Sequence, residues 1–98
     1  VDEGDLIAEA LGDKKVIILQ NHGILTTGPS VDIALWFYTS MERCCQAQLM
    51  ADAAGETQLI PHDTAIKTRS FIANDVAAWA SFQPAFDMIC KKEPDLFD

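Results

Sequence analysis

The most constraining feature of this sequence is the segment 30–54, which contains neither glycine nor proline. Those two residue types have the lowest helix propensities and commonly mark helix ends. The hydroxyl of Ser30 can accept hydrogen bonds from the first free N–H groups, and Asp32 lies in the first turn, where the helix dipole favours an acid. The sequence therefore predicts a long helix from about Val31 to Ala54.

The apolar side chains of this helix form two adjoining stripes, so more than one neighbour is expected to cover them. One stripe contains Ile33, Phe37, Cys44, Ala47 and Ala51, and the other contains Ala34, Tyr38, Met41, Cys45 and Leu49.

The residues before this helix predict a short helix and two strands. Apolar residues recur at helical spacing within 6–11, and Gly12 is placed to end that helix. The run Val16–Leu19 is rich in β-branched and aliphatic residues, as in a strand covered on both faces. Residues 21–23, Asn-His-Gly, interrupt the chain before a second extended piece at 24–27. An α/β arrangement follows.

Beyond Gly55 the pattern predicts two further helices. Asp63 or Thr64 can cap a helix that runs to about Asn74. Pro84 can open a final helix, which Pro94 ends; this helix contains Phe86, Met88 and Ile89. Two short strands are too few for a complete α/β sheet, so most of the partner sheet is expected outside these residues.

Composition excludes several classes of function. The chain has 98 residues, enough for one domain at most, and 7 Lys and Arg against 15 Asp and Glu give a net charge of −8. The cations are scattered along the sequence, so no nucleic-acid partner is expected. The longest apolar run, 33–38, is far too short to span a bilayer. Three cysteines without metal-binding spacing indicate free thiols in a reducing, cytoplasmic compartment.

His22 is the main candidate for chemistry, because it stands between two strand-like runs, beside a glycine that allows close approach. Two interpretations stay open from the residues alone. His22 is either a turn residue satisfied by a backbone carbonyl or a ligand or catalyst. His62 lies in a polar loop and is interpreted as a surface residue. Ser30 and Ser40 lack the glycines of a nucleophile elbow.

The segment 19–28, Leu-Gln-Asn-His-Gly-Ile-Leu-Thr-Thr-Gly, followed by Ser-Val-Asp-Ile-Ala at 30–34, resembles the C-terminal half of class II aldolase/adducin domains. The resemblance is close over residues 5–54 and looser over the helical tail 55–98, where Trp-Ala-Ser-Phe-Gln-Pro at 79–84 is similar to the tail of some family members. Residues 1–98 are therefore expected to be part of one such domain.

The resemblance implies a three-layer αβα sandwich around a mostly antiparallel sheet, assembled as a homotetramer in the cytoplasm. It implies a catalytic divalent metal ion, usually Zn²⁺, bound by three histidines, of which His22 matches the third. It further implies cleavage or epimerisation of a sugar phosphate, or of a similar small carbonyl substrate, through a metal-stabilised enediolate.

The other two metal ligands of that family form a His-x-His motif, and its acid/base is a glutamate upstream; these 98 residues contain no His-x-His. The chain alone is therefore expected to be inactive, as part of a longer zinc-dependent aldehyde-lyase whose other ligands lie upstream. No catalytic residue is assigned within it. The alternative is a non-catalytic, adducin-like interaction or scaffold module that binds no metal.

Overall fold

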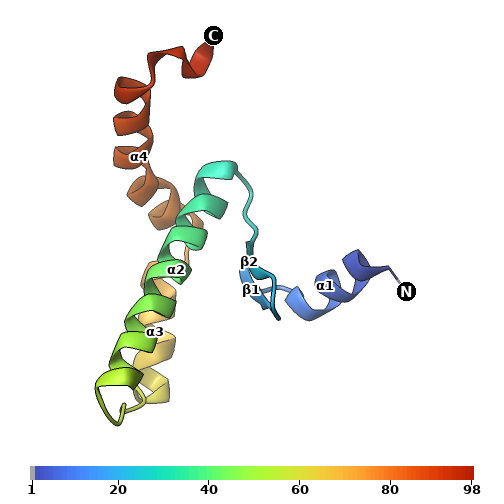
Figure 1. The fold of residues 1–98 in the computed structure, drawn as a ribbon, viewed down its shortest axis with the longest axis vertical. Coiled ribbons are helices and arrows are strands. Elements are labelled where there is room, and N and C mark those ends of the chain that lie inside the picture. The colour runs from blue at the N-terminus through green and yellow to red at the C-terminus, as the bar shows by residue number, and fades with distance from the viewer. Residues whose placement is uncertain (1) are drawn as a thin grey trace.

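The computed structural model describes residues 2–98 of the chain. Figure 1 shows a small hairpin with the N-terminal helix on one side and the other helices on the opposite side. The elements are α1 (Glu3–Leu11), β1 (Val16–Leu19), β2 (Gly23–Thr26), α2 (Val31–Ala54), α3 (His62–Ile72), α4 (Asp75–Lys92) and a 3₁₀ turn, η1 (Pro94–Phe97). The α/β class expected from the sequence is confirmed.

The long helix α2 has the predicted bounds, and its cap is the predicted residue. The backbone of Ser30 is extended, and its hydroxyl accepts a hydrogen bond from the N–H of Ile33 at 3.4 Å. Gly55 ends the helix. Nearer the N-terminus, Gly12 ends α1 with a φ of 54°, a left-handed conformation that glycine adopts without steric cost.

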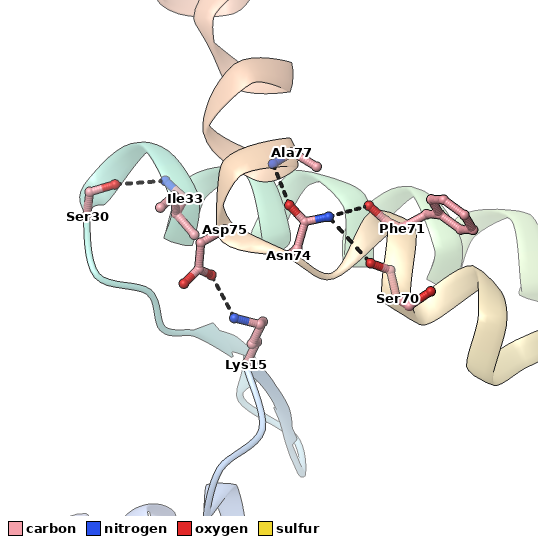
Figure 2. Close-up of polar contacts among 8 residues, drawn as sticks. All are labelled: Lys15, Ser30, Ile33, Ser70, Phe71, Asn74, Asp75 and Ala77. Carbon is pink, nitrogen blue, oxygen red and sulfur yellow. Dashed lines mark hydrogen bonds and ion pairs between the residues drawn. The ribbon is translucent and has the colours of Figure 1, made fainter.

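The second half differs from the sequence-based prediction at two places. α3 begins at His62 without a side-chain cap, so neither Asp63 nor Thr64 caps it. Pro84 does not open a helix but lies inside α4, which begins nine positions earlier, after Asn74. The side chain of Asn74 accepts a hydrogen bond from the N–H of Ala77 at 2.8 Å, so the true cap is ten residues before the proline (Figure 2).

Packing in the described residues is sparse. Three of them are buried, namely Ile33 and Phe37 of α2 and Ala78 of α4, with Val16 and Trp36 packed partly against them. α2 contacts the hairpin and α4, whereas α3 meets α4 at the two-residue junction 73–74 and does not approach α2 closely. The radius of gyration is 16.2 Å, against about 13 Å for a compact domain of this length. The arrangement is open.

Much apolar surface is correspondingly exposed. Ile18 of β1 is 60% exposed, so within the described residues this strand is not covered on both faces as expected. Leu49 of α2 and Val76 of α4 are more than two-thirds exposed. In residues 2–98, no helix is both long enough and apolar enough to cross a bilayer.

Candidate functional site

The candidate site is the tip of the β1–β2 hairpin, where His22 lies. The strands pair antiparallel with Leu19 opposite Gly23, so residues 20–22 form a three-residue connection. Asn21 has a φ of 56°, a left-handed conformation that asparagine tolerates better than most side chains. The N–H of His22 donates to the carbonyl of Leu19 at 3.1 Å and closes the turn. The backbone at His22 is therefore fixed by local hydrogen bonding.

The His22 side chain is exposed, and among the described residues its imidazole makes no hydrogen bond. Of the two interpretations left open by the sequence, a side chain satisfied by a backbone carbonyl is thus not observed. A Cβ placed on the next residue, Gly23, would meet no atom within 4 Å. Open space beside an unpaired imidazole suits the approach of a ligand or of another chain segment.

The hairpin is anchored to α2 by close contacts. The hydroxyl of Thr26 donates to the carbonyl of Ala34 at 2.8 Å, which joins the end of β2 to the first turn of α2. A Cβ on Gly28 would lie 2.9 Å from Ile33 Cγ2 and 3.0 Å from the Ala34 nitrogen, so the connection passes too close to the helix for any side chain. These contacts hold the hairpin that carries His22 against the first turn of α2.

The structure does not complete a metal site around this histidine. Within residues 2–98, no group of three or more His, Cys, Asp or Glu side chains is placed to hold a metal ion. His62 is exposed, as expected for a surface residue, but it begins α3 and does not lie in a loop as predicted. The thiols of Cys44, Cys45 and Cys90 are all free. His22 is therefore a potential single ligand rather than a finished site.

Comparison with protein families gives one match that covers half of the chain. Residues 1–49 match the model described as the class II aldolase and adducin N-terminal domain. This segment includes the hairpin and most of α2.

Individual relatives extend the similarity to nearly the whole chain. The chain is 39% identical over 95 residues to the decarboxylase NovR of Streptomyces niveus, covering 97% of this chain and 35% of that protein. It is 38% identical over 65 residues to rat alpha-adducin (Rattus norvegicus), covering 61% of this chain and 9% of the relative.

A solved structure shows the same arrangement of elements. L-fuculose 1-phosphate aldolase from Glaciozyma antarctica PI12 superposes with a TM-score of 0.90 at 40% identity, over 96% of this chain and 38% of that one. The chain thus spans about a third of the length of these two enzyme relatives.

Proposed function

The chain belongs to the class II aldolase and adducin family, and on that premise we propose that the complete protein is a metal-dependent lyase. It acts on a small carbonyl substrate, such as a sugar phosphate, and breaks the carbon–carbon bond between the α and β carbons of that carbonyl. The observation that carries this proposal is His22, which the hairpin presents with an exposed and unpaired imidazole.

The names of the two enzyme relatives support this reaction class. One is a decarboxylase and the other a sugar-phosphate aldolase. Decarboxylation of a 3-oxo acid and aldol cleavage both break a carbon–carbon bond and leave an electron pair that a neighbouring carbonyl must accept. In both reactions negative charge develops on the carbonyl oxygen, so a site that stabilises this charge serves either one.

His22 fits as one ligand of a divalent metal ion, because a neutral imidazole is a common metal ligand. This imidazole is exposed, and the hairpin that carries it is anchored to α2. When bound, a metal such as Zn²⁺ would act as a Lewis acid toward the substrate carbonyl. A catalytic zinc site commonly takes three protein ligands, so the others must come from outside these residues. The role of this chain is to fix the backbone position from which the imidazole projects, through the 19–23 turn.

The exposed apolar side chains favour assembly. Ile18, Leu49 and Val76 are all at least 60% exposed, and burial is worth about 25 cal/mol per Å² of apolar area. We propose that they are covered by the remainder of the domain and by the neighbouring subunits of a homotetramer. The free thiols suit a cytoplasmic setting.

A non-catalytic scaffold is the second candidate, and the similarity to alpha-adducin favours it. The two proposals differ in their dependence on metal. The test is cleavage of sugar-phosphate substrates by the full-length protein before and after chelation. A lyase loses activity with the chelator and recovers it with added Zn²⁺. A scaffold shows no cleavage in either condition, and that result would refute the enzymatic proposal.

A further inference from the structure

A second feature, separate from the hairpin tip, is a cavity of about 690 Å³ between the start of β1, α2 and α3. Val16, Phe37 and Ile66 give it apolar walls. It lies where α3 does not approach α2 closely. Its volume lies within the range of roughly 300–1,000 Å³ that is usual for small-molecule sites. Val16 begins β1 and His22 follows its other end, so the cavity and the candidate metal ligand lie at opposite ends of this strand.

Cationic side chains line the cavity, although the chain as a whole is strongly acidic. Lys14, Lys15 and Arg69 line it, although the whole chain has only 7 Lys and Arg and a net charge of −8. Lys14 and Lys15 come from the loop before β1, whereas Arg69 comes from the last turn of α3. The cations that appear scattered in the sequence are therefore partly gathered by the fold.

One of these charges is already neutralised. Lys15 Nζ lies 2.7 Å from Asp75 Oδ1 (Figure 2). It also lies 5.1 Å from the centroid of the Phe37 ring, so this lysine is held against the cavity wall. Lys14 and Arg69 have no ion-pair partner within residues 2–98. Asp13 is the one acidic side chain among the lining residues. The charges of Lys15 and Asp75 cancel. The remaining charged groups are two cations, Lys14 and Arg69, and one anion, Asp13, so the net charge is +1.

We propose that this cavity binds a small organic monoanion, a carboxylate attached to an apolar ring or short chain. The guanidinium of Arg69 offers the paired donors that match a carboxylate, and Lys14 adds a second cation. The Phe37 and Ile66 side chains provide the apolar surface for the rest of the molecule. A net charge of +1 favours a monoanion over a phosphate dianion, which would remain uncompensated beside Asp13. This site goes beyond the proposed metal chemistry and does not depend on it.

The test is calorimetric titration of the full-length protein with benzoate, using benzamide and benzyl phosphate as comparison ligands. The His22→Ala background is used, because a carboxylate could otherwise coordinate a metal ion at the hairpin tip. We expect benzoate to bind at least tenfold more tightly than the uncharged benzamide, and more tightly than benzyl phosphate. Arg69→Gln should weaken benzoate binding about tenfold or more.

The matched control is Lys67→Gln, which removes a cation from the same helix but does not line the cavity. This variant should bind benzoate like the unsubstituted background. Lys14→Gln is the second test variant, and it should also weaken binding. Equal affinities for the Arg69→Gln and Lys67→Gln variants would overturn the proposal. The proposal would also fail if benzoate did not bind at millimolar concentration, if benzamide bound equally well, or if benzyl phosphate bound more tightly. A crystal structure of the full-length protein with another protein segment in the cavity would overturn it as well.

Discussion

Lys15 Nζ lies 2.7 Å from Asp75 Oδ1, a contact between residues sixty positions apart in the sequence. It joins the loop before β1 to the first turn of α4, and Figure 2 shows it beside the Asn74 cap. The two side chains are 36% and 45% exposed, so water and salt screen the pair.

This screening sets the expected strength of the pair. A double-mutant cycle with Lys15→Gln and Asp75→Asn in the full-length protein should give a coupling of about 0.5 kcal/mol, measured by denaturant unfolding. The coupling should fall further at high salt. A coupling of about 2 kcal/mol or more, insensitive to salt, would show that the pair is buried in the complete protein.

Gly28 is predicted to be intolerant of any side chain. Gly28→Ala would place a Cβ 2.9 Å from Ile33 Cγ2 and 3.0 Å from the backbone nitrogen of Ala34, which belongs to α2 and cannot easily move. The expected loss in the free energy of unfolding is about 1–3 kcal/mol. The matched control is Gly4→Ala in α1, where a Cβ meets nothing within 4 Å and should be neutral or slightly stabilising. Equal effects of the two substitutions would contradict the close approach.

Residues 1–98 are predicted not to fold stably by themselves. Ile33, Phe37 and Ala78 are the buried residues within 2–98, which is too small a core to offset a chain-entropy cost of about 1–2 kcal/mol per residue. Sedimentation of the isolated segment should show association, and its thermal unfolding should lack a sharp transition. A monodisperse monomer that unfolds cooperatively would identify an autonomous domain instead.

The sequence was most informative where local signals agreed with one another. α2 has the bounds predicted from the Ser30 cap and the absence of glycine and proline up to Gly55. The two strands were predictable because β-branched runs flank a turn-forming Asn-His-Gly. The position of His22 at the hairpin tip followed from those two predictions.

Pro84 misled the prediction because a proline can either begin a helix or interrupt one. Inside α4 it removes the donor for the carbonyl of Ala80. Both residues are exposed, so water can satisfy that carbonyl and the helix continues. The Asn74 cap was the better signal for the start of α4, with Asp75 following it in the first turn.

The cationic cavity was not predictable, because its residues are far apart in the sequence. Lys14 precedes β1 and Arg69 lies in α3, and only the packing of distant segments brings both to one space. No local periodicity encodes that packing. The same limit applies to the metal site, whose remaining ligands no pattern within these residues specifies.

The central claim, that His22 is a metal ligand, is tested most directly by elemental analysis of the purified full-length protein. His22→Ala is compared with His62→Ala, which removes the chain's other histidine from an exposed position on α3. The account predicts a divalent metal ion, with Zn²⁺ expected, in the unsubstituted protein and in the His62→Ala variant, and a metal content at least tenfold lower in the His22→Ala variant. Equal metal content in all three proteins, or none in any of them, would contradict it.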